Sequence, residues 1–426
     1  MAATPAVPVR AASGEQKAAT AAPAPIAGAL REEAGGMLRR FYASREYKPL
    51  WIRNGRISAT AERFLSYVET ADLDGLKPSS YRPDDLRDAI RESRDGGVEA
   101  LVRAELMLSD SFSRFVRDQR RPVKVGMVYT DSDLKPKKLK PEMVLRAAAL
   151  AGPFPDYVAD MAWMSPHYVR LRNLLAHVEK AGEEQEGRGQ ELDRLRLNLD
   201  RARGLPGPWT MHVVVDASSA RLWYYQGGKQ LGTMKVVVGT HETQTPMMAG
   251  MLQWAILNPY WNIPDYLVQK NIAPKILSGR TLPSMRIEAL SDWSANPEKL
   301  PPDSIDWAAV AAGQTNVRLR ELPGGANSMG KVKFLFPNDE GIYLHDTPNR
   351  ALLAKADRHL SNGCIRLENA PALGKWLLRK PITAASKTPE QYAPLPVPVP
   401  VYLTYLTAAA TEKGVVFRKD IYGRDE

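Results

Sequence analysis

The stretch Met211-His-Val-Val-Val-Asp-Ala-Ser-Ser-Ala-Arg-Leu-Trp-Tyr-Tyr225 contains two short apolar runs separated by a small polar turn. Runs of β-branched and aromatic residues bounded by Asp and Ser are typical of strands. Similar runs recur over residues 231–238, 250–257, 331–336 and 341–345. Several short strands with few helices predict an antiparallel β sandwich or barrel in this part of the chain.

Residues 258–327 interrupt this strand pattern with an irregular stretch that is rich in Pro, Trp and Ser. A connection of this length is too long for a plain loop in a compact domain. We therefore expect an inserted cap or lid.

The chain before the strands has a helical pattern. Its apolar residues recur at roughly helical spacing, as in Leu101, Val102, Leu106, Leu108, Phe112, Phe115 and Val116. The predicted fold class is therefore α+β and multidomain, with an all-α domain before a β-rich one. The predicted segments are a disordered Ala/Pro-rich tail at 1–30, a helical domain at 31–180, a charged helix and linker at 181–208, a β-rich domain at 209–420 and a tail at 421–426.

The net charge of +10 and the pI near 9.4 suggest a polyanionic neighbour. The chain has no zinc-finger spacing, RNP-like string or long basic block, so we expect no nucleic acid partner.

No run approaches the roughly 20 apolar residues of a membrane span. Residues 1–30 lack the apolar core of a signal peptide, and we expect an exported chain from which the signal was removed. The six histidines show no metal-ligand spacing, so neither metal nor cofactor is expected.

The single cysteine lies in the string Ser361-Asn-Gly-Cys364-Ile-Arg366. Free cysteines are commonly small buried hydrophobes, but this polar turn is a poor place to bury a thiol. An arginine and backbone N–H groups beside a thiol are surroundings that lower its pKa and favour a nucleophile. Arg366, two residues away on a strand, would share a face with Cys364 and could hold the thiolate or a substrate carboxylate.

His345 ends the apolar run 341–345 and could supply the base for the thiol. His359 is a competing candidate, although its closeness to Cys364 in sequence also suits a residue that supports the turn. Ser132 and Ser328 begin S-x-x-K strings, but no K-T-G string accompanies them. We therefore expect no serine acyl-enzyme.

His345, fifteen intervening residues and then Ser361-Asn-Gly-Cys364-Ile-Arg366 resemble the signature of L,D-transpeptidases with the YkuD catalytic domain. The strings at 235–239, 258–264, 304–307, 330–334 and 417–423 resemble the large Gram-negative subgroup typified by YcbB. Residues 36–165 are similar to the helical scaffold domain of that subgroup. Two departures stand out: the chain has no room for the subgroup's peptidoglycan-binding module, and Asn362 replaces a histidine found in many relatives.

The resemblance implies a peptidoglycan cross-linking reaction. The Cys364 thiolate would attack the carbonyl of the third stem residue, usually diaminopimelate, and release D-alanine. A second stem would then aminolyse the thioester. His345 would act as general acid and base, and the backbone of Gly363 would help to bind the oxyanion. The resemblance also implies a substrate-binding set consisting of Arg366, Tyr343, Trp261, Ser361 and Asn362; Tyr343 and Trp261 could instead be packing residues of the cap.

Other outcomes of the same thioester are hydrolysis by an L,D-carboxypeptidase, exchange with a D-amino acid, and attachment of a lipoprotein. An alternative from another class is a peptidoglycan-binding scaffold without catalysis. The expected partners are donor and acceptor tetrapeptide stems, carbapenem inhibitors at Cys364, and other cell-wall enzymes that the helical domain could dock. The expected location is the periplasm.

Overall fold

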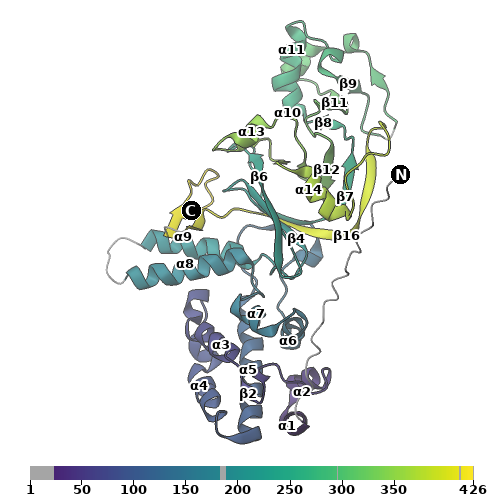
Figure 1. The fold of residues 1–426 in the computed structure, drawn as a ribbon. Helices are drawn as coiled ribbons and strands as arrows, with labels where there is room; N and C mark the ends of the chain where they lie inside the picture. Colours follow the sequence, from purple (N-terminus) through teal and green to yellow (C-terminus); the bar gives the residue numbers. More distant parts are fainter. Residues whose placement is uncertain (1–23, 183–188, 295, 412–413, 426) are drawn as a thin grey trace, which may run out of the picture. The chain divides into compact units, whose positions relative to one another are not determined.

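The computed structural model describes residues 24–182, 189–294, 296–411 and 414–425. The chain forms two compact units (Figure 1). Unit 1 comprises the residues up to 69, residues 77–115 and residues 141–149, and unit 2 comprises residues 70–76, 116–140 and 150–426.

Unit 1 is mostly helical. It contains α1 (Ala24–Glu33), α2 (Gly36–Ala43), α3 (Thr60–Glu69), α4 (Pro83–Glu92), most of α5 (Gly97–Gln119), most of α6 (Pro141–Leu150) and the hairpin β1 (Ile52–Arg53) and β2 (Arg56–Ile57). Ile26 and Leu30 of α1 are buried, so the predicted disordered tail is wrong for residues 24–30, because α1 has apolar side chains to bury. Residues 1–23 of that prediction lie outside the described residues.

A buried carboxylate organises the core of unit 1. Glu105 of α5 accepts hydrogen bonds from the backbone N–H groups of Leu50, Trp51 and Ile52, at 2.5, 2.9 and 3.0 Å. The hydroxyl of Tyr42 donates to the same carboxylate at 2.6 Å. Burial raises the pKa of Glu105, and these donors oppose that shift. Glu105 therefore ties the segment before β1 to the long helix α5.

Unit 2 contains a β barrel. Eight strands follow one another around it in the order β12-β13-β15-β6-β5-β4-β16-β7, and β7 pairs back with β12 to close the ring. Their bounds are β4 His212–Asp216, β5 Arg221–Gln226, β6 Lys229–Gly239, β7 Met248–Leu257, β12 Val332–Leu335, β13 Leu344–His345, β15 Ile365–Leu367 and β16 Gln391–Thr404. Two further strands join this sheet: β3 (Val128–Tyr129) beside β7, and β14 (His359–Ser361) beside β6.

The barrel is mixed, which corrects the expectation of a purely antiparallel sheet. β13 runs parallel to β15, and β16 runs parallel to β4. Parallel neighbours need long connections, and both pairs have them, because residues 346–364 separate β13 from β15 and most of unit 2 separates β4 from β16. The helix α14 (Ala370–Leu378) follows β15 and contributes buried leucines to the barrel core.

The interval predicted as a cap contains a sheet with its own core. Strands β8 (Trp261–Ile263), β9 (Ile287–Leu290), β10 (Lys299–Leu300) and β11 (Arg318–Glu321) pair in the order β10-β9-β11-β8. The short helices α10 (Asp265–Leu267), α11 (Ala273–Leu277) and α12 (Trp307–Ala311) complete it (Figure 1). Their buried apolar side chains form a cluster separate from the barrel core.

The segments predicted as a charged linker and a tail are parts of unit 2. After α8 (Pro166–Gly182), helix α9 (Gly189–Arg203) buries several side chains, including Arg201. The carboxylate of Asp425 binds Arg194 and Arg201 at 2.6 Å each, and Tyr422 is buried. The predictions of an exposed helix and of a tail at 421–426 are therefore wrong for these described residues, because buried ion pairs anchor both segments; residues 183–188 and 426 lie outside the described residues.

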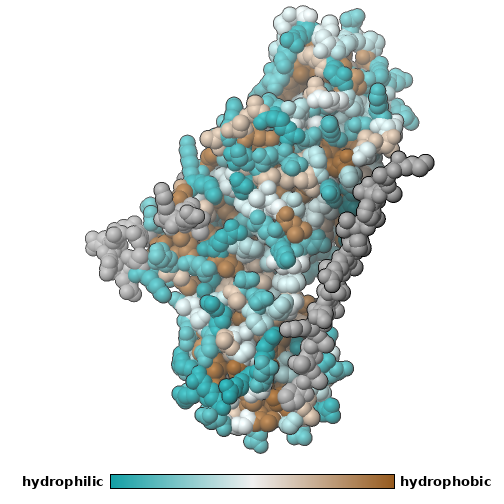
Figure 2. All heavy atoms as spheres, viewed as in Figure 1, coloured by the Kyte–Doolittle hydropathy of each residue, from teal (hydrophilic) through white to brown (hydrophobic). Residues whose placement is uncertain are grey.

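The surface shown in Figure 2 has hydrophilic residues interspersed with small hydrophobic patches. Within the described ranges, no helix is both long and apolar enough to span a membrane. The same ranges contain no group of three or more His, Cys, Asp or Glu side chains arranged to hold a metal ion.

Candidate active site

The candidate site lies on two neighbouring strands of the barrel. In the parallel register of β13 and β15, Leu344 is opposite Ile365 and His345 is opposite Arg366. The N–H of Ile365 donates to the carbonyl oxygen of Tyr343 at 2.9 Å, which extends this pairing back toward Cys364. Leu344 and Ile365 are fully buried in the barrel core.

Alternation along these strands brings the predicted residues together. Because successive side chains point to opposite faces of a sheet, Tyr343, His345, Cys364 and Arg366 share the face opposite the barrel core. Because Cys364 lies two residues before Arg366, it is the diagonal neighbour of His345 across the two strands. The arrangement therefore places a nucleophile, a base and a cation on one surface.

The turn before Cys364 requires glycine. Gly363 has φ +101°, and a Cβ there would lie 3.2 Å from Cδ1 of Ile342. Among the described residues, the peptide N–H groups of Gly363 and Cys364 make no hydrogen bond. Both groups therefore remain available as hydrogen-bond donors.

A threonine that the sequence did not point out holds this turn. The hydroxyl of Thr245 donates to the carbonyl oxygen of Gly363 at 2.7 Å and accepts from the N–H of Gly239 at 2.9 Å. The hydroxyl of Tyr422 donates to the carbonyl oxygen of Gly239 at 2.7 Å. Barrel strand β6, the turn before Cys364 and the C-terminal segment are thus joined by these hydrogen bonds, which makes Thr245 a candidate positioning residue. No motif marks Thr245, because its contacts come from distant segments.

Ser361 also stabilises the turn, through a hydrogen bond within it. Its buried hydroxyl donates to the carbonyl oxygen of Cys364 at 2.6 Å. The predicted direct substrate contact is wrong for this residue, because its hydroxyl is turned inward and already engaged. Asn362, by contrast, is exposed at the tip of the turn.

The thiol of Cys364 is half-buried and donates weakly to the carbonyl oxygen of Gly341, with Sγ and O 3.5 Å apart. Burial raises the pKa of Cys364 to about 11, while a backbone hydrogen bond from Tyr343 and the charge of Arg366 oppose the shift. The expectation of a lowered pKa is therefore wrong for the free protein. Desolvation of the thiolate outweighs the nearby cation.

His345 is buried with one ring nitrogen engaged. Its Nδ1 lies 2.6 Å from the carbonyl oxygen of Asp346. A carbonyl oxygen can only accept, so Nδ1 carries the proton and Nε2 keeps a lone pair. Burial, with further contributions from Arg366 and Lys333, lowers the pKa of His345 to about 3. The imidazole is therefore neutral at physiological pH and able to accept a proton.

The residue that orients His345 is itself fixed. The carboxylate of Asp346 accepts from the N–H of Lys331 and pairs with Arg350, both at 3.0 Å. Gly330 has φ +61°, and a Cβ there would lie 2.5 Å from Oδ2 of Asp346. Glycine at 330 therefore leaves room for the carboxylate that holds the Asp346 backbone in place.

His359, the competing base, has both ring nitrogens engaged. Nδ1 lies 2.6 Å from Oδ1 of Asp357, and Nε2 lies 2.9 Å from the carbonyl oxygen of Ala217. With no free nitrogen, His359 supports β14 and leaves His345 as the candidate base.

Arg366 is half-buried and makes no hydrogen bond or ion pair with a described residue. Its Nε is buried without a partner. Burial lowers the pKa of its guanidinium, while the charge of Cys364 opposes that shift. An unpaired guanidinium beside the thiol is suited to bind either the thiolate or a substrate carboxylate.

The two predicted aromatic residues differ in their surroundings. Burial and the charge of Cys364 raise the pKa of Tyr343, which places its phenol near the thiol. Trp261, in β8, packs against the cap core, and the contacts of Cys364 do not include it. Tyr266 of α10 was missed by sequence reasoning. Its side chain is partly exposed, and partial burial and the charge of Cys364 raise its pKa, so Tyr266 is a cap residue within the electrostatic influence of the thiol.

Two parts of the chain match known protein families. Residues 36–175 match the Scaffold domain family, and residues 210–389 match the YkuD family of L,D-transpeptidase catalytic domains. Over 400 residues, the chain is 28% identical to a Haemophilus influenzae protein described as "Putative L,D-transpeptidase", covering 91% of this chain and 78% of that protein.

Solved structures show a weaker likeness. An L,D-transpeptidase from Mycobacterium smegmatis matches with 12% identity over 45% of this chain and 58% of its own, at a TM-score of 0.23. An L,D-transpeptidase solved in complex with imipenem matches with 13% identity over 46% of this chain and 58% of its own, also at 0.23. TM-scores this low do not establish a shared fold, so the assignment of the two domains comes from the sequence matches. The chain therefore contains a scaffold domain followed by a YkuD L,D-transpeptidase catalytic domain, which is the YcbB-like arrangement.

Proposed function

We propose that this chain is a cysteine-dependent peptidoglycan L,D-transpeptidase that links the third residue of one stem to the third residue of another. The observation that carries the proposal is the position of Cys364 directly before β15, diagonal to His345 of β13, with Nε2 of the neutral imidazole free. The family assignment supports the reaction class.

In the first half-reaction, the sulfur of Cys364 attacks the carbonyl carbon of the third stem residue while its proton passes to Nε2 of His345. Because the resting pair is a neutral thiol and a neutral imidazole, proton transfer accompanies attack rather than preceding it. The N–H groups of Gly363 and Cys364 would stabilise the oxyanion, and each such donor is worth roughly 3 kcal/mol.

Collapse of the tetrahedral intermediate breaks the peptide bond, and His345 returns the proton to the departing amino group of D-alanine. In the second half-reaction, the amine of another stem attacks the thioester and gives up its proton to His345. The sulfur then leaves and recovers its proton, which closes the cycle without a cofactor.

Transfer to an amine over hydrolysis requires that water be excluded from the thioester, and we assign this role to the cap, whose Tyr266 is influenced by the charge of Cys364. Hydrolysis, D-amino-acid exchange and lipoprotein attachment use the same thioester with another acceptor. Since peptidoglycan lies outside the cytoplasmic membrane, we propose a periplasmic location, which cell fractionation would test.

The test is intact-protein mass spectrometry after incubation with a carbapenem or with a disaccharide-tetrapeptide. Wild type should gain one drug adduct and yield a cross-linked dimer that lacks one D-alanine, whereas Cys364→Ala should do neither. His345→Gln should acylate about 10²–10⁴-fold more slowly. Tripeptide as the sole product would favour the carboxypeptidase, and an unreactive wild type would favour a binding scaffold.

A further inference from the structure

A cavity in unit 2, referred to below as the second cavity, shares no lining residue with the candidate active site. Its volume is about 250 Å³, and neither Cys364 nor His345 lines it. Segment 120–139, the end of α9 and one residue of β16 enclose it. Its cationic lining residues are Arg120, Arg121, Lys135, Lys137 and Arg203.

Three of these five cations have no carboxylate partner among the described residues. Lys137 pairs with the lining residue Asp133, and Arg203 pairs with Asp200. Arg120, Arg121 and Lys135 make no such pair, so their charges are uncompensated.

The guanidinium of Arg120 is held in place by backbone oxygens. Nη1 of Arg120 donates to the carbonyl oxygens of Trp163 and Leu205, at 3.0 and 3.3 Å. Nη1 of Arg121 likewise donates to the carbonyl oxygens of Asp74 and Asp118. Burial lowers the pKa of Arg120, which reflects the cost of a charge without a counter-ion. Carbonyl oxygens orient these guanidinium groups but do not neutralise them.

Two tyrosine hydroxyls complete the donor set. Tyr129 and Tyr402 both line the cavity, and neither hydroxyl makes a hydrogen bond with a described residue. Tyr402 is only 6% exposed, so its unpartnered hydroxyl is part of a built surface. Hydroxyl and guanidinium donors together suit the oxygens of a carboxylate or a phosphate.

We infer that this cavity binds a multiply charged oxyanion. The uncompensated charges, the two free hydroxyls and the volume fit a group with two or more carboxylate or phosphate oxygens. The carboxylates of a peptidoglycan stem peptide are one source, and that choice alone rests on the proposed function. A free or polymer-linked phosphate is the other.

The experiment is isothermal titration calorimetry on the full chain carrying Cys364→Ala, which prevents turnover. The probes are inorganic pyrophosphate and the tripeptide L-Ala-D-Glu-diaminopimelate, each at low ionic strength. Binding of one equivalent is expected for at least one probe, and the tighter probe identifies the source. Lys135→Gln and Tyr402→Phe should each weaken it at least tenfold.

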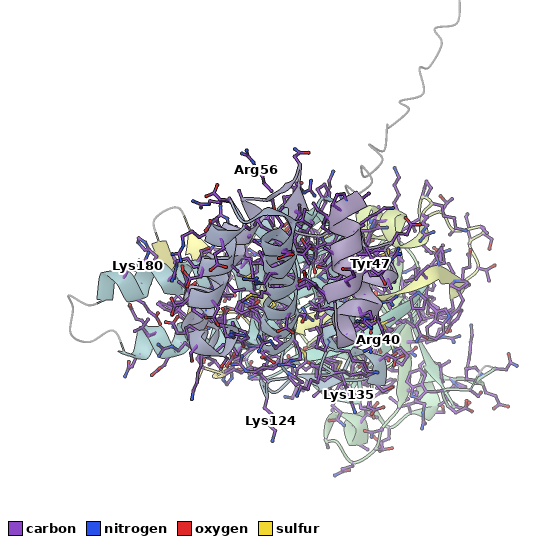
Figure 3. All side chains as sticks on the ribbon, turned by 90° about the horizontal axis from the view of Figure 1, so that it is seen from below. Arg40, Tyr47, Arg56, Lys124, Lys135 and Lys180 are labelled. Atoms are coloured by element: carbon purple, nitrogen blue, oxygen red, sulfur yellow. The ribbon has the colours of Figure 1, made fainter. Side chains whose placement is uncertain are left out.

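Lys180→Gln is the matched control, because it removes the same charge from an exposed lysine that Figure 3 shows well separated from Lys135. Tyr402→Phe removes only a hydroxyl without a protein partner, so its thermal unfolding should match that of its parent. Absence of binding by both probes, or equal weakening by Lys180→Gln, would overturn the inference. Carbapenem acylation of the Lys135→Gln single variant, with Cys364 intact, reports separately on the proposed function.

Discussion

The strand pair around Cys364 and the C-terminal segment around Asp425 differ in how they treat arginine side chains. Arg366 lies half-buried two residues after Cys364, and it makes no ion pair or hydrogen bond with a described residue, whereas the Nε atoms of both Arg366 and Arg201 lack a partner. Arg201 is 3% exposed, yet it binds Asp425 at 2.6 Å and the carbonyl oxygen of Tyr405 at 3.2 Å. Both side chains are withdrawn from water, but only Arg201 has its charge matched.

This difference distinguishes arginines whose charge is matched inside the protein from arginines whose charge is available to a ligand. A buried cation without a partner costs stability, so its persistence points to a partner that arrives from outside. The histidines follow the same rule, since His359 has both ring nitrogens engaged and His345 has one. Arg120 in the second cavity belongs with Arg366, because carbonyl oxygens hold it without neutralising it.

The largest expected effect is destabilisation in acid. Burial lowers the pKa of His345 and His167 to about 3 and that of His212 to about 4. Above pH 6.5 these histidines are neutral in both the folded and the unfolded chain, and they do not lower the free energy of unfolding. As the pH falls toward 4, the unfolded chain binds protons that the buried imidazoles of the folded chain do not bind, so the free energy of unfolding decreases. Each histidine should cost on the order of 3 kcal/mol by pH 4. Denaturant unfolding of the full chain at pH values between 7 and 4 measures this loss of stability in unit 2.

His345→Gln asks whether the site histidine takes part in this loss. The variant should lose less stability than wild type between pH 7 and 4. His241→Gln, which changes an exposed histidine, is the control and should lose as much as wild type. Parallel curves for wild type and His345→Gln would contradict a buried, neutral His345.

A smaller effect is expected from breaking the C-terminal ion pairs. Asp425→Asn removes the charge that Arg194 and Arg201 share, and it should lower the free energy of unfolding by about 3 kcal/mol. Asp85→Asn, at an exposed pair with Arg82, should change it by less than about 1 kcal/mol. If Asp425→Asn were as mild as Asp85→Asn, the C-terminal pairs would not be the anchor described above.

The smallest effect is expected at the turn that holds the nucleophile. Thr245→Val leaves the N–H of Gly239 and the carbonyl oxygen of Gly363 without their partner, which should cost about 1–2 kcal/mol of stability. The rate of carbapenem acylation, monitored by mass spectrometry, should fall about tenfold because the turn that carries Cys364 is no longer held by this hydrogen bond. A tenfold lower rate corresponds to an activation free energy that is about 1.4 kcal/mol higher. Thr245→Ser keeps the hydroxyl and should restore the rate. A normal rate in Thr245→Val would remove Thr245 from the positioning residues.

The candidate residues of the active site could be proposed from the sequence because their motifs are local, whereas the pairing of β13 with β15 came from the fold. The motif from Ser361 to Arg366 and the run that ends at His345 each lie within a few residues, and alternation along a strand determines which side chains share a face. The same reasoning misjudged Ser361, since a hydroxyl in a turn can point outward or inward, and neighbouring elements decide which.

Other features required the fold. Thr245, Tyr266 and the lining of the second cavity come from segments far apart in sequence, and no spacing rule connects them. The C-terminal residues looked like a tail because few of them are apolar, yet Asp425 is held by two arginines of α9.

The sequence by itself determined the order of helical and strand-rich segments and named Cys364 and His345 as the candidate nucleophile and base, because periodicity and a short motif encode them. Only the tertiary structure decided the pKa of Cys364 and His345, the inward turn of Ser361 and the unpaired state of Arg366 and Arg120. The physical reason is that desolvation and pairing depend on every element that packs around a group, and those elements meet only when the chain folds.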